Sequence, residues 1–497
     1  MKTIQLLFCS ILLASAMPAQ RLPRKATPYL DTALEVSNYL TSLERPQAIG
    51  IAWPASDQPA TYVSTGVSDG AAGIGFFYLR LYQVTGDPAF LDKAGKAADF
   101  VDHEYRNGIY GNYDWLSGVA GGGEFFLALY SETADPAALD RATYAGNWLV
   151  SNALSGANGY HWEFPGLTNI YTSLAHGAGG VALFLAHLYR QTGDPKYLQY
   201  AEGAVRWLRQ YTVPLPNSAI GWKRLTTDTT YNGWCGGSAG VYFILKELWQ
   251  VTGNNGYRDL MLATARGLLV AADWKCPGGG AYAASSGCPG GALPQAAWGY
   301  GTPSYNDYPE IVCHGAASIL FVLFDAFAST GDATFRDTAR AGIRWLEAVA
   351  KAQPQGLRWE HIYGSGLLEP GLLTGTASIG YAFLRFSRMD PVSTVGAATL
   401  ADRPLAARVP KSPYLGVAQA AADYLLSAAD HPQAGQARWL TYSLPKPSWA
   451  SDPASYPVEY DTGWYSGAAG IGIFFLDLHA ATCGMEAVSD DLSPLNP

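Results

Sequence analysis

The stretch Ser68–Tyr82, SDGAAGIGFFYLRLY, begins with small residues and continues as an almost unbroken apolar run. The same pattern returns along the 497-residue chain, beginning at Leu116, Ala175, Cys235, Cys313, Leu373 and Tyr465. Seven equivalent openings predict seven equivalent helices, since self-similarity along a chain is the signature of a repeat architecture. Each run is apolar on nearly all sides, so we expect these helices to be packed on several faces.

A second signature follows five of these runs and predicts a different kind of helix. In it an Asp or Asn precedes a segment with apolar residues at i, i+3, i+4 and i+7, which is typical of a capped, amphipathic helix. The five signatures begin at Thr85, Thr133, Thr192, Thr252 and Thr330. Two matching segments, from Thr27 and from Ser412, supply such a helix to the first and last units.

Together these helices predict an all-α fold, a closed α/α toroid with a ring of seven inner helices inside a ring of seven outer helices. An open helical array is the alternative, but it would need polar caps that neither end of the sequence shows. We expect residues 20–497 to form this single domain, with rim insertions at about residues 276–307 and 390–411 that are rich in Gly, Pro, Ser and Ala.

Residues 1–19 carry one Lys, a short apolar run and small residues near their end, a pattern that predicts a signal peptide. The protein is therefore expected to be secreted or periplasmic, with a buried N-terminal helix as the alternative. No later apolar stretch is long enough to span a bilayer. The net charge of −9 and the lack of Lys/Arg runs argue against nucleic acid or anionic membranes as partners.

The cysteines divide into two groups. Of the six in the sequence, Cys9 would leave with the signal peptide, and the odd number that remains cannot all be paired as disulfides. Cys276 and Cys288 each precede Pro-Gly-Gly in the first insertion, and we interpret them as a loop disulfide, with Cys483 as the odd free thiol.

The other two cysteines stand just ahead of a motif glycine, where a toroid brings distant segments together. These slots hold Asp69, Ser117, His176, Cys235 with Gly236, Cys313 with His314, Thr374 and Ser466. Cys235, Cys313 and His314 form a Cys2His set suited to Zn²⁺, and three protein ligands leave the fourth position open for water or substrate. The alternatives are a Cys235–Cys313 disulfide and three core residues without a metal.

The motifs WCGG at Trp234, CHG at Cys313 and AHG at Ala175 resemble those of the lanthionine synthetase C-like family. The resemblance implies zinc on Cys235, Cys313 and His314. It also implies catalytic roles for His176 and Asp114, for which a satisfied polar residue and a helix cap are the alternatives.

Three features depart from the family pattern. Tyr231 and Gly236 stand where family cyclases carry Arg and often a polar residue. One unit precedes Asp114 where two are expected, which indicates a circular permutation. Family cyclases also act in the cytoplasm, whereas this chain is expected to be exported.

The favoured function is a zinc-dependent enzyme that activates the thiol of a peptide or small molecule for addition to a dehydroamino acid or similar alkene, as in thioether formation. The alternative is a carbohydrate-active toroid hydrolase, with carboxylates from Asp114, Glu163 in HWEFPG and Glu360 in RWEHIYG. A third reading is a non-catalytic binding protein stabilised by zinc.

Overall fold

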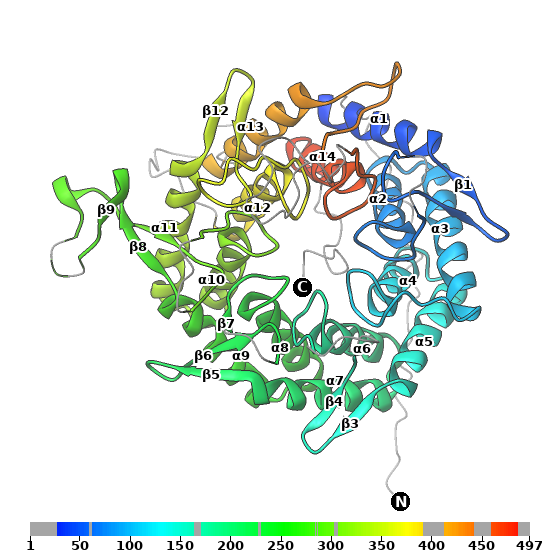
Figure 1. Cartoon of the computed structure of the whole chain (residues 1–497), viewed down its shortest axis with the longest axis horizontal. Coiled ribbons are helices and arrows are strands. Elements are labelled where there is room, and N and C mark those ends of the chain that lie inside the picture. The colour runs from blue at the N-terminus through cyan, green and yellow to red at the C-terminus, as the bar shows by residue number, and fades with distance from the viewer. Residues whose placement is uncertain are drawn as a thin grey trace, which may run out of the picture.

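The computed structural model describes residues 27–58, 62–163, 170–226, 230–283, 285, 287–302, 307–390, 412–441 and 459–485. The expected signal peptide and nearly all of the insertion expected at 390–411 lie outside these residues. The described part contains fourteen α-helices that alternate between an outer and an inner ring (Figure 1). The inner helices are α2 (Ala71–Thr85), α4 (Val119–Thr133), α6 (Ala178–Thr192), α8 (Ser238–Thr252), α10 (Ala316–Thr330), α12 (Thr376–Met389) and α14 (Ala468–Thr482).

The outer helices surround them in the same order. They are α1 (Pro28–Ser42), α3 (Pro88–Arg106), α5 (Pro136–Ser151), α7 (Pro195–Leu208), α9 (Asn255–Val270), α11 (Ala333–Val349) and α13 (Pro413–Ala428). The last inner helix, α14, packs against α1 and α2 at the start of the chain as well as against α12, so the ring is closed. The predicted closed α/α toroid is therefore confirmed.

The helix starts follow the two sequence signatures. The five outer helices with the second signature begin after Asp87, Asp135, Asp194, Asn254 and Asp332, and each of these side chains accepts a hydrogen bond from the backbone N–H two residues later. Every inner helix instead begins after its motif glycine, without a side-chain cap. Small residues are needed there because the backbones of neighbouring units meet at this point.

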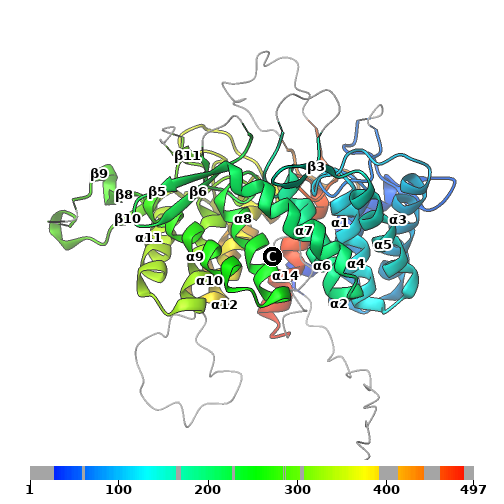
Figure 2. The same cartoon turned by 90° about the horizontal axis from the view of Figure 1, so that it is seen from below.

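Short strands in the segments between outer and inner helices lie mostly at one end of the ring (Figure 2). A four-stranded sheet has the order β11 (Gly301–Thr302), β7 (Thr230–Tyr231), β6 (Ala219–Lys223), β5 (Thr212–Leu215), and a three-stranded sheet has the order β10 (Gln295–Ala297), β8 (Asp273–Cys276), β9 (Gly280–Ala281). The remaining pairs are β1 (Arg45–Pro46) with β2 (Ile51–Ala52), β3 (Leu154–Gly156) with β4 (Gly159–His161), and β12 (Lys351–Gln353) with β13 (Gly356–Arg358).

A buried Trp ties many of these segments to the preceding outer helix. Trp53, Trp162, Trp298, Trp359 and Trp439 each donate an indole N–H to a Leu carbonyl at the end of that helix, at 2.8–3.0 Å. The last carbonyls of a helix lack intrahelical partners, so this bond satisfies one of them. The Trp-Glu contexts of Glu163 and Glu360 thus reflect a structural Trp that the units share.

At the axis, the units are joined by a closed ring of backbone hydrogen bonds. The residue two positions before each motif glycine donates its N–H to the carbonyl of the equivalent residue in the next unit, at 2.8–3.2 Å. The order is Ser68, Leu116, Ala175, Cys235, Cys313, Leu373, Tyr465 and back to Ser68. We call these seven residues the axial ring.

Aromatic side chains occupy the centre next to the axial ring. Trp115, Trp234 and Trp464 each directly precede a ring residue and are at most 2% exposed. The Trp115 ring lies 5.6 Å from that of Trp234 and 5.9 Å from that of Trp464, although no two of these three units are neighbours in the ring. Contacts between non-adjacent units are possible only across the axis, so the middle of the toroid is packed rather than open.

Glycines four residues before a motif glycine allow the units to approach one another. A Cβ added to Gly463 would lie 2.3 Å from the Ser68 carbonyl oxygen and 2.6 Å from the Asp69 Cα, so the last unit meets the first through backbone contact. Gly66, Gly233 and Gly371 have equivalent contacts with the next unit.

We predict that Gly463→Ala destabilises the protein by about 1–3 kcal/mol, because the added methyl group collides with backbone at the point of ring closure. Gly95→Ala, inside α3, is the matched control, since nothing lies within 4 Å of its added Cβ. That variant should raise stability by about 0.5–1 kcal/mol through helix propensity. Denaturant unfolding measures both, and equal effects of the two substitutions would contradict the close approach.

Candidate functional site

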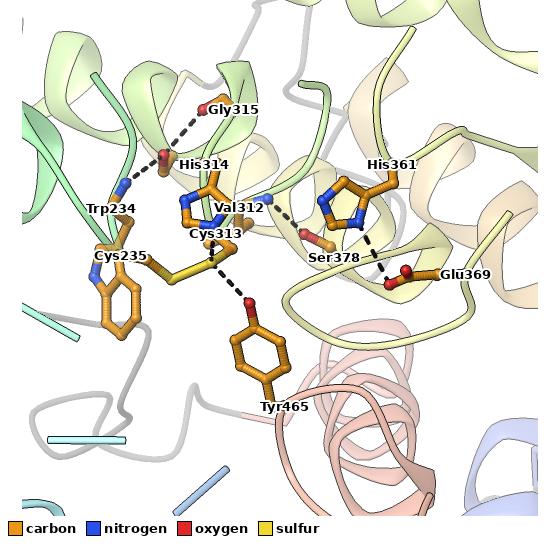
Figure 3. Close-up of a disulfide and its surroundings, with 11 residues drawn as sticks. Trp234, Cys235, Val312, Cys313, His314, Gly315, His361, Glu369, Ser378 and Tyr465 are labelled. Carbon is orange, nitrogen blue, oxygen red and sulfur yellow. Dashed lines mark hydrogen bonds and ion pairs between the residues drawn. A yellow bond between two sulfur atoms is a disulfide. The ribbon is translucent and has the colours of Figure 1, made fainter. Parts of the chain in front are cut away.

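Cys235 and Cys313 are neighbours in the axial ring, and the Cys235 N–H donates to the Cys313 carbonyl at 2.8 Å. Their Cα atoms are 5.0 Å apart, and the structure joins their sulfurs as a disulfide. His314 follows directly, and its Nε2 lies 3.4 Å from the Cys313 Sγ (Figure 3). Within the described residues this is the one group of three or more His, Cys, Asp or Glu whose ligand atoms lie close enough for a metal, all within 4.8 Å of one another.

The donor set fits zinc in its reduced form. A disulfide and a thiolate pair are two states of the same cysteines, and of these two states zinc binds the thiolate pair and not the disulfide. The structure shows the oxidised state, which is one of the alternatives that the sequence left open. His314 supplies a second reason for the fit: its Nδ1 is buried and has no hydrogen-bond partner among the described residues.

Burial, together with nearby positive charge, keeps the His314 imidazole neutral, the form in which a nitrogen can bind a metal. Burial lowers the pKa of His314 to about 3, and the nearby charges of His361, Arg224 and His176 act in the same direction.

Tyr465 is a neighbour that the sequence analysis missed. Its hydroxyl lies 3.0 Å from the Cys313 Sγ, although it belongs to the last unit of the chain. The axial ring explains the contact, since Tyr465 is the second ring residue after Cys313. Tyr465 stands two positions before its motif glycine, as Cys235 and Cys313 do. This shared repeat position could have predicted the contact from the sequence.

Asp114 and His176 form a hydrogen-bonded pair. The His176 Nδ1 lies 2.9 Å from the Asp114 Oδ2, and the Asp114 side chain is 1% exposed, against 41% for His176. The other carboxylate oxygen, Oδ1, accepts from the Ser117 N–H at 2.6 Å. Asp114 therefore also stabilises the turn before α4 through this backbone hydrogen bond. That second role resembles the helix cap that the sequence analysis gave as the alternative for Asp114.

Repeat geometry accounts for this pair. Asp114 stands four residues before its motif glycine, where Gly233 and Gly463 stand in other units. Those glycines contact the residue directly before the motif glycine of the next unit, respectively His314 and Asp69. A side chain at position 114 therefore reaches the equivalent residue of its own next unit, which is His176.

Arg224 reaches the site from the end of β6. Its guanidinium carbon lies 4.5 Å from the centre of the Tyr231 ring, and its carbonyl oxygen accepts from the Thr172 N–H at 2.9 Å. Tyr231 stands where the resemblance to family cyclases led us to expect Arg. The structure places the guanidinium of Arg224, which follows β6, against the Tyr231 ring. Sequence spacing could not reveal it, because β6 and β7 pair through tertiary structure.

A second His–carboxylate pair lies near His314. The His361 Nδ1 is 3.4 Å from the Glu369 Oε2, and the two side chains are 15% and 7% exposed (Figure 3). Neither residue was predicted, because both lie in the irregular segment between β13 and α12, where no repeat position marks them.

The three carboxylates of the carbohydrate alternative lie in separate local networks. Asp114 binds His176, and Glu163 pairs with the His161 Nε2 at 3.0 Å. Glu360 accepts from the Gly364 N–H at 2.6 Å and stands beside the buried Glu310. The described geometry offers no observation that unites them as an acid–base pair.

The remaining cysteines agree with the sequence interpretation. Cys276 and Cys288 form a disulfide, and Cys483 is in no disulfide among the described residues. The Cys483 Sγ lies 3.7 Å from the His479 Nδ1.

The fold and the site together define an α/α toroid with a cysteine-rich axial centre, and the comparisons with known proteins specify the class further. Residues 102–272, which include Asp114, His176 and Cys235, match the family model of lanthionine synthetase C-like protein. This part of the chain is therefore similar to that family. Cys313 and His314 lie beyond the matched residues.

Solved structures with a similar arrangement include enzymes of different kinds. A sugar epimerase from a ruminal bacterium is 14% identical, with 67% of this chain and 89% of that chain covered and a TM-score of 0.45. Nisin cyclase is 14% identical, with 57% and 70% covered and a TM-score of 0.43. An inactive variant of the α-1,6-mannanase of Salegentibacter sp. is 14% identical, with 63% and 85% covered and a TM-score of 0.40.

No curated protein matches the sequence. None of the helices in the described ranges has both the length and the apolar character needed to cross a membrane.

Glu310 offers a test of the electrostatics next to the site. It is fully buried, its Oε2 accepts from the Glu360 N–H at 3.1 Å, and its Oε1 has no partner among the described residues. Burial and the Glu360 charge raise the pKa of Glu310 to about 9, so the folded protein holds a proton there that the unfolded chain releases near its ordinary pKa of 4.5.

The raised pKa implies that Glu310 lowers stability increasingly as the pH rises from about 4.5 towards 9. Glu310→Gln removes this dependence. We predict that the variant is close to the parent protein at pH 4.5 and more stable at pH 8 by on the order of 2 kcal/mol. Urea unfolding at both pH values measures the difference, and a gap that does not grow with pH would contradict the raised pKa.

Proposed function

We propose that the protein is a zinc-dependent enzyme that adds a thiol to a dehydroamino acid or a similar activated alkene. The observation that carries the proposal is that the ligand atoms of Cys235, Cys313 and His314 lie within 4.8 Å of one another. Neighbouring units of the same ring also contribute the Asp114–His176 pair. The lanthionine synthetase C-like match over residues 102–272 supports the reaction class.

The reduced Cys235 and Cys313 and the neutral His314 would hold zinc, and the ion when bound would lower the pKa of a substrate thiol in the fourth position. His176 is suited to transfer the proton that the substrate thiol loses. Its Nδ1 is engaged by Asp114, so Nε2 is the nitrogen that can face substrate, and the side chain is 41% exposed.

The bonds balance as a simple addition across the double bond. The thiol sulfur forms a bond to the β-carbon of the alkene, and the π electrons move to the α-carbon and its carbonyl. His176 carries the thiol proton to the α-carbon, while Asp114 orients the imidazole and stabilises its protonated form. The substrate is a peptide or small-molecule thiol. Export and the circular permutation of the units stay predictions from the sequence.

We predict that the reduced protein binds one equivalent of zinc and that Cys313→Ser and His314→Ala lose it, because each removes a ligand. Cys276→Ser/Cys288→Ser is the control and should keep its zinc, because this disulfide lies in the insertion hairpin.

His176→Ala should also keep zinc but lower the rate of thiol addition to a small dehydroalanine acceptor by about 10²–10⁴, since it removes a proton carrier.

Metal analysis alongside this assay separates the alternatives. Zinc loss in His176→Ala would make His176 a fourth ligand, close the site and overturn the catalytic role. A protein that binds zinc but adds no thiol would be the non-catalytic alternative, and a metal-free protein that cleaves a glycan would favour the carbohydrate alternative.

A further inference from the structure

The axial ring contains one aromatic residue, Tyr465. The other six positions hold Ser68, Leu116, Ala175, Cys235, Cys313 and Leu373. Backbone bonds fix Tyr465 on both sides, because its N–H donates to the Ser68 carbonyl at 2.9 Å and its carbonyl accepts from the Leu373 N–H at 3.0 Å. Trp464, the residue before it, is 1% exposed and packs against Trp115 across the axis. The backbone that carries the Tyr465 side chain is therefore held firmly in place.

The Tyr465 side chain reaches back over one unit to Cys313. Leu373 lies between the two residues in the ring order, yet the Tyr465 hydroxyl lies 3.0 Å from the Cys313 Sγ. A sulfur in a disulfide carries no proton, so the hydroxyl is the donor in this contact. In Figure 3 the Tyr465 hydroxyl and the His314 ring meet this sulfur from opposite sides, with the His314 Nε2 at 3.4 Å. The hydroxyl therefore contacts Cys313 without standing between the sulfur and His314.

The two cysteines of the candidate metal site differ in this respect. Both side chains are buried, with Cys235 2% and Cys313 1% exposed, so water contributes little to either sulfur. Within the part of the chain that the structure describes, the Cys313 Sγ has the Tyr465 hydroxyl as a donor, whereas the Cys235 Sγ has its disulfide partner and no hydrogen bond. A hydrogen bond is stronger in such a dry interior than in water. In the reduced pair, the Cys313 thiolate is thus the one that a donor stabilises.

A donor at a ligand sulfur changes what a bound metal does. The hydrogen bond draws negative charge from the sulfur, so the sulfur passes less charge to the ion. An ion that receives less charge lowers the pKa of its other ligands further, and a thiol in the fourth position then loses its proton more readily. Partners of the ligands are known to tune metal sites in this way.

We propose that Tyr465 is a positioning residue of the metal site: its hydroxyl donates a hydrogen bond to the Cys313 thiolate and thereby increases the acidity that bound zinc gives to a substrate thiol. The inference rests on the proposed zinc-dependent thiol addition and adds to it a residue from the last unit of the chain. In this role Tyr465 acts through Cys313 and forms or breaks no covalent bond.

Cobalt(II) in place of zinc makes the hydrogen bond measurable. The reduced full chain is loaded with one equivalent of Co²⁺, which has absorption bands in which charge moves from thiolate sulfur to the metal. Loss of the donor raises the energy of the sulfur lone pairs, so Tyr465→Phe should move these bands to longer wavelength and keep the cobalt bound. Tyr105→Phe is the matched control and should leave the bands unchanged, since the buried Tyr105 hydroxyl donates to the Gly118 carbonyl at 3.2 Å and not to a sulfur.

The pH dependence of thiol addition is the second measurement, made on the zinc-loaded protein with a small dehydroalanine acceptor. Tyr465→Phe should be about 10-fold slower than the unaltered protein at neutral pH, as expected when a metal ligand loses its hydrogen-bond partner. The difference should shrink as the pH rises, because the bound thiol then ionises without the help of the hydrogen bond. Tyr105→Phe should keep the profile of the unaltered protein, and circular dichroism checks that each variant is folded.

Unshifted cobalt bands in folded Tyr465→Phe, or a rate loss that is the same at every pH, would overturn the role of Tyr465 and leave the zinc-dependent reaction intact. Loss of cobalt from Tyr465→Phe would make the hydroxyl a metal ligand and also overturn the role. The proposed function fails separately: shifted bands in Tyr465→Phe, without thiol addition by the unaltered protein, would keep the hydrogen bond to the metal ligand and reject the reaction. An unaltered reduced protein that binds no cobalt would refute both.

Discussion

The axial ring of hydrogen bonds is the constraint on which the rest of the structure depends. Each of its seven residues donates to one neighbour and accepts from the other, so the ring is complete only when the last unit returns to the first. Buried backbone groups are costly when unpaired, which makes a missing unit or an open array unfavourable. The same bonds fix the spacing of the residues that carry them, and a cysteine pair in adjacent positions is brought to a Cα separation of 5.0 Å.

A second contact adds direction to this ring. The residue four places before a motif glycine faces the residue directly before the motif glycine of the next unit, and most units keep the first of these positions as glycine. Where a unit has Asp114 instead, the backbone contact becomes a hydrogen bond to His176. The candidate catalytic pair is therefore a local variation of a packing rule that the whole toroid shares.

Residues tied to the repeat could be predicted from the sequence, and those outside it could not. The helices, the convergence of Cys235, Cys313 and His314, and the meeting of Asp114 with His176 all follow positions that recur relative to a motif glycine. Arg224, His361 and Glu369 come from segments between outer and inner helices that differ from unit to unit, so no spacing marks them. The redox state of Cys235 and Cys313 is likewise outside the pattern, because the same positions serve a disulfide and a thiolate pair equally well.

The tryptophans that meet across the axis affect the path that a ligand can take to the cysteines. Trp115, Trp234 and Trp464 fill the centre beside the axial ring, so the two ends of the toroid are separated by packed side chains. Side chains of neighbouring inner helices also pair with one another, as His187 of α6 does with Glu124 of α4 and Arg80 of α2 with Asp477 of α14. We therefore expect a ligand that reaches Cys235 to enter and leave by the same end of the toroid.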